Sequence, residues 1–100
     1  MRVRRKPGAY ETLIKFDKFY IDNPEVYKGK WHEVFGNTNP IHSEFGGGKG
    51  KFIIEMAKQN PDINYIMVDA VTEVVLKAVE RAEQERDIPN LKIIKIDLRF

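Results

Sequence analysis

Residues 41–54, with the sequence IHSEFGGGKGKFII, decide how the rest of the chain is arranged. A short apolar run ends in the acid Glu44 and breaks into glycines, after which apolar residues recur at helical spacing. Four of the seven glycines of the chain lie here, namely Gly46, Gly47, Gly48 and Gly50. This pattern predicts a strand, a tight turn that lets backbone approach a ligand closely, and a helix whose first N–H groups face that ligand. We therefore expect a site for a nucleotide-like cofactor.

The spacing of the glycines excludes two common phosphate-binding motifs. The dinucleotide fingerprint G-x-G-x-x-G fails because Lys51 or Ile53 stands where the third glycine is needed. The P-loop fails because neither glycine-lysine pair is followed by serine or threonine. What remains is E-x-G-x-G-x-G, which resembles the first motif of the class I methyltransferases that bind S-adenosylmethionine. It is formed by Glu44, Gly46, Gly48 and Gly50. A purely structural glycine elbow is the alternative.

Composition narrows the class of protein. A chain of 100 residues with 42% hydrophobic and 32% charged residues is typical of one small, soluble domain. The absence of cysteine excludes disulfides, thiolate metal sites and a cysteine nucleophile. His32 and His42 have no partner at ligand spacing, so we expect no metal. Because no apolar run has membrane-spanning length and no signal region follows the N-terminus, we expect a cytoplasmic protein without membrane contact.

Positive charge is concentrated at the N-terminus. The net charge is only +2, yet four cations fall within the first six residues, at Arg2, Arg4, Arg5 and Lys6. A basic arm of this kind can neutralise backbone phosphates of a nucleic acid without reading its bases. From the charges alone, a solvated, disordered tail is the slightly favoured interpretation.

The chain divides into an extension, residues 1–39, and a domain, residues 40–100. In the extension, residues 10–20 predict a short helix or irregular segment packed on the domain. Residues 30–35 predict a short helix that buries Trp31, Val34 and Phe35 together. A core position is the favoured role for Trp31, with stacking on a base as the alternative.

The domain shows an alternation of strands and helices. The expected elements are a strand at 40–45, a helix at 50–59, a strand at 65–68, a helix at 71–82 and a strand at 91–96. We expect the first helix to bury a stripe of Phe52, Ile53, Met56 and Ala57. The order β-α-β-α-β predicts an α/β fold with a parallel sheet, a partial Rossmann-like methyltransferase fold. The sheet should have three strands, with the strand at 40–45 as an open edge. Ser43 is unusual there, because such a strand is normally buried on both faces.

Each expected strand ends in an acid, at Glu44, Asp69 and Asp97. Ligands of open parallel sheets bind beyond the carboxyl ends of the strands, so the three carboxylates should line one crevice. Asp69 is placed to accept hydrogen bonds from both hydroxyls of a ribose, and the alternative is that it caps the following helix. Asp97 could accept from an adenine amino group, and Glu44 would lie near the cationic amino acid end of the cofactor. Such an acidic site favours S-adenosylmethionine over a pyrophosphate.

Longer segments resemble one family, the bacterial tRNA (guanine-N7-)-methyltransferases of the TrmB type. The resemblance covers nearly the whole chain and is carried by RVRRKP, NPEVYKGKWHEVFGN, PIHSEFGGGKGKFI and MAKQNPDINYIMVD. It implies a donor site formed by Glu44, Asp69, Asp97 and the glycine loop, and a basic arm that contacts tRNA. The family usually has glutamate at the position of Asp69. Its later D-P-W-P-K-type segment, near the target guanine, is absent from this sequence.

The resemblance implies transfer of the sulfonium methyl group to N7 of a variable-loop guanine in tRNA. N7 already carries a lone pair, so positioning should dominate catalysis and no base is needed to create the nucleophile. The catalytic residues are expected beyond Phe100, and we expect this chain alone to transfer little methyl. A non-catalytic nucleotide- or RNA-binding module is the alternative, and a dehydrogenase-like domain is a weaker one.

Overall fold

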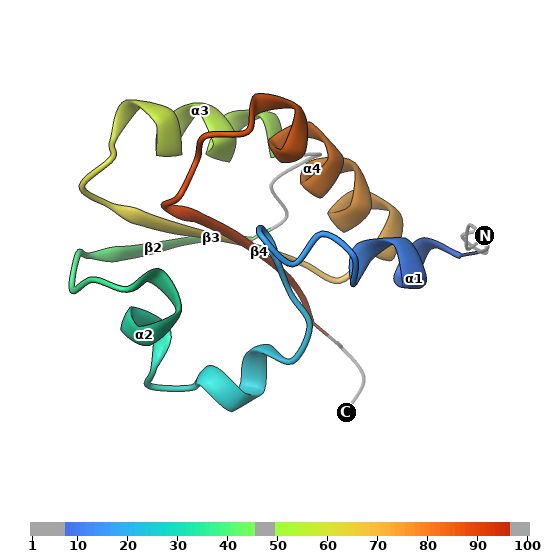
Figure 1. The fold of residues 1–100 in the computed structure, drawn as a ribbon, viewed down its shortest axis with the longest axis horizontal. Helices are drawn as coiled ribbons and strands as arrows, with labels where there is room; N and C mark the ends of the chain where they lie inside the picture. Colours follow the sequence, from blue (N-terminus) through green and yellow to red (C-terminus); the bar gives the residue numbers. More distant parts are fainter. Residues whose placement is uncertain (1–7, 46–49, 97–100) are drawn as a thin grey trace.

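The computed structural model describes residues 8–45 and 50–96 and shows a single sheet with helices on both faces (Figure 1). The sheet has four strands in the order β1-β4-β3-β2, and every pair is parallel. Helices α1, α3 and α4 lie on one face, whereas α2 and the 3-10 helix η1 lie on the other (Figure 1). The bounds are α1 Ala9–Leu13, β1 Tyr20–Ile21, η1 Pro24–Tyr27, α2 Trp31–Phe35, β2 Ile41–Phe45, α3 Lys51–Gln59, β3 Asn64–Asp69, α4 Thr72–Glu85 and β4 Leu91–Lys95.

The α/β class, the parallel pairing and the order of the three longer strands agree with the sequence prediction. The prediction of only three strands was wrong. β1, two residues long, adds to the far side of β4 and comes from the segment for which only a helix or irregular chain was expected. β2 pairs only with β3 among the described strands, so it is the predicted open edge. Ser43 fits there because most of β2 is exposed rather than buried on both faces.

The core lies between the sheet and the helix layer of α1, α3 and α4. The periodic face of α4 contributes Val75, Ala78, Val79 and Ala82, each fully buried, as its i, i+3, i+4, i+7 spacing predicts. These side chains pack against Met67 of β3 and Ile93 of β4 in one cluster. Burying a large aliphatic side chain contributes about 1.5–3 kcal/mol. This cluster therefore fixes α4 on the sheet, and with it the helix N-terminus beside β3.

Two predictions of burial were wrong. Phe52 is 62% exposed, because α3 is turned so that Ile53, Ile54 and Ala57 face the sheet. Helix α2 forms at the predicted place but contains no fully buried residue. Trp31 is half-buried, with its ring centroid 5.8 Å from that of Tyr27. The apolar side of α2 thus lies partly open because little of the chain packs beneath it.

The buried side chain of Asn90 joins α3 to the start of β4. Its Nδ2 donates to the carbonyl oxygens of Ala57 at 2.9 Å, Asn60 at 3.1 Å and Ile63 at 2.8 Å. Carbonyls at a helix end lack partners within the helix, and buried ones are costly without a donor. One amide thus satisfies the end of α3 and the loop that leads into β3.

Across the described residues, no helix is long and apolar enough to cross a membrane.

Candidate functional site at the carboxyl ends of the strands

The parallel sheet brings the carboxyl ends of all four strands to one edge, here called the carboxyl rim. It is formed by the last residues of each strand together with the starts of α3 and α4. Glu44 pairs with Met67 in the register of β2 and β3. Because side chains alternate along a strand, Glu44 and Asp69 face the same side of the sheet as Met67, which is the helix side. The two carboxylates therefore belong to one face of the carboxyl rim.

Asp69 holds the turn that starts α4. Its side chain is 9% exposed, and its Oδ1 accepts a hydrogen bond from the backbone N–H of Val71 at 2.9 Å. The backbone carbonyl of Asp69 accepts from the N–H of Ile96 at 3.0 Å, which ties this turn to β4. The helix-capping role considered from the sequence is not formed, because Val71 is the N-cap residue of α4 and no side chain caps this helix. Within the described part of the chain Oδ2 has no hydrogen-bond partner, so the carboxylate could hold this turn and accept from a ligand hydroxyl together.

Gly50 is required by the packing of α3 on α4. It precedes α3 with a φ of +81°, a left-handed conformation that residues with a Cβ rarely adopt. A Cβ at this position would lie 2.8 Å from Cβ of Ala78 and 3.2 Å from its Cα. Gly50 therefore has a structural function whether or not a cofactor binds beside it.

Several predicted site residues lie outside the described residues. These are Gly46, Gly48 and Asp97 of the donor site and Arg2, Arg4, Arg5 and Lys6 of the basic arm. Their roles stay predictions. Of the predicted donor-site residues, Glu44, Gly50 and Asp69 are the ones that the structure brings to the carboxyl rim.

Sequence reasoning did not anticipate Lys95 in this site. In the register of β3 and β4 it lies directly beside Asp69. Its ammonium group thus comes from the next strand on the same face of the carboxyl rim. A cation at the end of a strand is common on protein surfaces, so no sequence signal distinguished it.

No group of three or more His, Asp or Glu side chains is arranged to hold a metal ion in the part of the chain that the structure describes.

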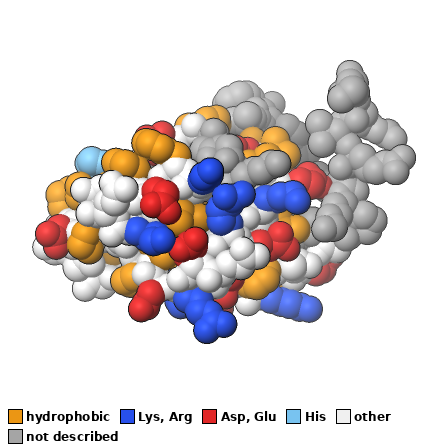
Figure 2. All heavy atoms as spheres, turned by 90° about the horizontal axis from the view of Figure 1, so that it is seen from above, with side chains coloured by type: hydrophobic (Ala, Val, Ile, Leu, Met, Phe, Trp, Pro, Cys, Tyr) orange, Lys and Arg blue, Asp and Glu red, His pale blue; other side chains and the backbone are white. Residues whose placement is uncertain are grey.

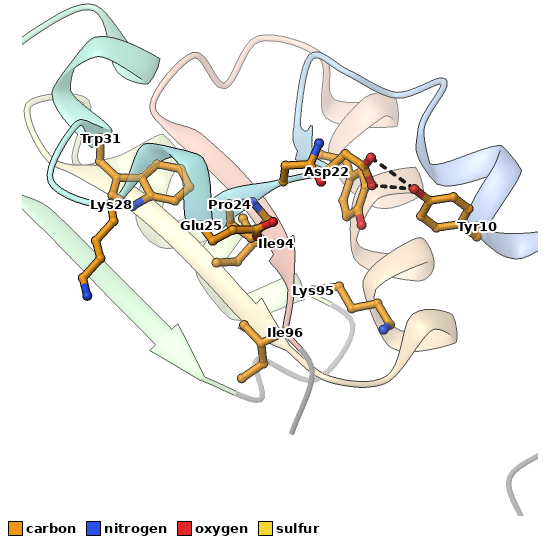
Figure 3. Close-up of a pocket in the computed structure, with 11 residues that line it drawn as sticks. Tyr10, Asp22, Pro24, Glu25, Lys28, Trp31, Ile94, Lys95 and Ile96 are labelled. Atoms are coloured by element: carbon orange, nitrogen blue, oxygen red, sulfur yellow. Dashed lines mark hydrogen bonds between the residues drawn. The ribbon is translucent and has the colours of Figure 1, made fainter. Parts of the chain in front are cut away.

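A pocket of about 590 Å³ lies at the corner of the sheet, where β1 and β4 end (Figure 3). We call it the corner pocket. It continues along the carboxyl rim from Lys95 and includes residues from α1, the β1–η1 segment and α2. Its volume is in the usual range for small-molecule sites. The residues that line it are Tyr10, Tyr20, Asp22, Asn23, Pro24, Glu25, Lys28, Trp31, Ile94, Lys95 and Ile96.

One end of the corner pocket carries a fixed carboxylate. The hydroxyl of Tyr10 donates to both carboxylate oxygens of Asp22, at 3.0 and 3.1 Å (Figure 3). Burial raises the pKa of Tyr20 to about 12, and the negative charge of Asp22 adds to this effect. The phenol of Tyr20 is therefore neutral at physiological pH. No spacing pattern in the sequence joins Tyr10 to Asp22, because their contact depends on the fold.

The helix layer, by contrast, mixes charges of both signs (Figure 2). Lys58 of α3 illustrates this, since its Nζ lies 2.8 Å from Oε1 of Glu85 on α4 and 3.7 Å from that of Glu55. The view in Figure 2 shows no continuous basic surface among the described residues.

Comparison with known proteins identifies the family to which the chain belongs. Residues 38–100, which include the carboxyl rim except for the end of β1, match the model of a family described as "Putative methyltransferase". The chain belongs to this methyltransferase family. The match covers the strands and helices that carry Glu44, Gly50 and Asp69.

Curated relatives resemble the chain over its whole length. It is 52% identical over 100 residues to a tRNA (guanine-N(7)-)-methyltransferase of Listeria monocytogenes serovar 1/2a, covering 100% of this chain and 46% of the relative. Enzymes of the same name from Streptococcus suis and Bacillus cytotoxicus are 50% and 47% identical over 97 residues, covering 97% of this chain and 45% and 44% of the relatives. The chain thus spans less than half the length of these relatives.

Proposed function

We propose that this chain forms the S-adenosylmethionine-binding part of a tRNA (guanine-N7-)-methyltransferase that acts in the cytoplasm. The observation that carries the proposal is the placement of Glu44 and Asp69 on one face of the carboxyl rim, in a chain about half identical to enzymes of that name. The second carboxylate oxygen of Asp69 supports the fit, since it is not used by the hydrogen bond to Val71. The donor supplies a methyl group on a cationic sulfonium centre, which an acid-lined site favours.

In this proposal each residue has a role in binding. Asp69 accepts hydrogen bonds from ribose hydroxyls, Glu44 lies near the amino acid end of the donor, and Asp97 accepts from the adenine amino group. The glycine loop gives the donor close access to backbone, with Gly46, Gly48 and Gly50 as its glycines. These groups bind and orient the methyl donor for in-line approach of guanine N7.

Calorimetric titration with S-adenosylmethionine tests the donor site. Asp69→Asn keeps an oxygen that can accept from the N–H of Val71 but removes the charge that a ribose would use. We expect binding to weaken by about tenfold or more, since a hydrogen bond to a charged group contributes about 1.5–3 kcal/mol. Asp62→Asn, an exposed site before β3, is the matched control and should bind like wild type. Equal affinity of wild type and Asp69→Asn would refute the ribose role.

The basic arm is tested separately with unmodified tRNA. Replacing Arg2, Arg4, Arg5 and Lys6 by alanine should weaken tRNA binding and reduce the slope of log K against log salt, because fewer counterions are released. An unchanged slope would show that the arm does not contact phosphates. Binding of tRNA without any binding of the methyl donor would instead favour the non-catalytic RNA-binding module.

A further inference from the structure

The corner pocket has a feature that donor binding does not require, namely an aromatic ring at each of its two ends and two carboxylates along its length. Trp31 lies at one end, and Tyr10 and Asp22 lie at the other (Figure 3). In the same view Glu25 and Ile94 lie between the ends, and Ile94 supplies apolar lining. The pocket therefore combines flat apolar surfaces with hydrogen-bond acceptors at one end and in the middle.

Asp22 and Trp31, at the two ends of the pocket, are held in place. Asp22 is fixed by the bidentate contact from the Tyr10 hydroxyl at 3.0 and 3.1 Å. Tyr27 packs beside Trp31 with an angle of 48° between the ring planes, which restricts the indole on one side. Trp31 nevertheless lines the pocket and stays half-buried. Pre-positioned aromatic and acceptor groups of this kind lose little entropy when a flat ligand binds.

Unpaired nucleobases match this combination. Proteins bind single-stranded nucleic acid by stacking bases on aromatic side chains and by hydrogen bonds to the exposed base edges. A carboxylate is an acceptor only, so it favours an edge that presents donors. Guanine presents two adjacent donors, its ring N–H and its amino group, whereas uracil presents one N–H between two carbonyls. Lys28 also lines the pocket at the Trp31 end and Lys95 near the Asp22 end, so each could contact a backbone phosphate at its own end (Figure 3).

We propose that the corner pocket is a subsite for two successive unpaired nucleotides of the RNA substrate, with a preference for guanine. Trp31 stacks on one base, and the carboxylates of Glu25 and Asp22 accept from the base edges. The subsite is distinct from the donor site and lies next to it along the carboxyl rim. This inference rests on the proposed function, because it takes RNA as the substrate.

Trp31 is the one tryptophan in the sequence, so its fluorescence reports on its own end of the pocket. Titration of the chain with the dinucleotide GpG should quench this fluorescence, and UpU should bind at least about tenfold more weakly, as expected for loss of a well-matched pair of base contacts. Glu25→Gln and Asp22→Asn should each weaken GpG binding by about fivefold or more, because an amide replaces one acceptor oxygen by an NH2 group, which donates where guanine also presents donors. The Asp62→Asn control should bind GpG like wild type.

Several outcomes would overturn the inference. These are absence of quenching by GpG, equal affinity for GpG and UpU, and unchanged GpG binding by both pocket variants while circular dichroism shows them folded. Competition between S-adenosylmethionine and GpG would also overturn it, because the pocket would then belong to the donor site. The two proposals can fail separately. If calorimetry shows no binding of the methyl donor, the proposed function fails, whereas the response to GpG is unaffected.

Discussion

Replacing Gly50 by alanine tests the close packing of α3 on α4. The left-handed backbone at Gly50 costs a residue with a Cβ about 1–2 kcal/mol, and the reduced entropy of the unfolded chain returns about 0.4–1 kcal/mol of that. The new Cβ would also lie 2.8 Å from Cβ of Ala78, on a helix that cannot move without disturbing the core. Overpacking of this kind costs about 1–3 kcal/mol. We expect Gly50→Ala to lower the free energy of unfolding by about 2–4 kcal/mol.

Gly36 provides a matched control. It has a φ of +76°, and a Cβ built there meets nothing within 4 Å. Gly36→Ala therefore carries the backbone cost without the steric one and should lower stability by about 1 kcal/mol or less. The difference between the two variants isolates the contact with Ala78. Adding Ala78→Gly to Gly50→Ala removes the closest atom, so the pair should show favourable coupling in a double-mutant cycle.

Urea unfolding followed by circular dichroism measures these free energies, and thermal unfolding gives an independent check. For a domain of this size, a loss of 2–4 kcal/mol corresponds to a fall in Tm of about 10–30 °C. If Gly50→Ala and Gly36→Ala lower the free energy of unfolding equally, or if Ala78→Gly gives no coupling, the close approach of the two helices does not explain why glycine is required at position 50. The requirement for Gly50 would then have to come from its backbone conformation or from a ligand.

Three further predictions concern other parts of the molecule. Asn90→Ala leaves buried carbonyls without their donor and should cost about 2–4 kcal/mol in urea unfolding, against about 1 kcal/mol for Asn60→Ala, which loses one bond to the carbonyl of Met56. The pKa of Tyr20 rises from 10.0 to about 12 on folding, so its contribution to stability is complete below pH 10 and is lost as pH rises towards 12. Relative to Tyr20→Phe, wild type should therefore lose stability between pH 10 and 12. A difference in unfolding free energy between the two proteins that stays constant over this range would contradict the raised pKa. Phe45→Lys, on the open edge strand β2 where Phe45 is 62% exposed, should reduce self-association measured by light scattering. Unchanged scattering would show that this edge does not mediate self-association.

Features encoded by residues close together in the chain could be predicted from the sequence, and the others could not. Helix α4 repeats its apolar residues over four turns, so its buried face could be read from the sequence. Glu44 and Asp69 could be placed together because parallel strands end at one edge of a sheet. Strand β1, in contrast, has two residues and gives no periodic signal. The burial of Phe52 was wrongly predicted because one apolar residue beside a stripe does not show how far the helix is turned.

The sequence by itself determined the alternation of strands and helices, the acids at the strand ends and the glycine bend before α3, because each depends on residues close together in the chain. Only the tertiary structure decided that β1 extends the sheet, that Gly50 is packed against Ala78, and that Tyr10, Asp22 and Trp31 surround one corner pocket. These features arise from contacts between segments far apart in the chain. Periodicity tells which side of an element is apolar, but packing in three dimensions decides what covers that side and what stays open to a ligand.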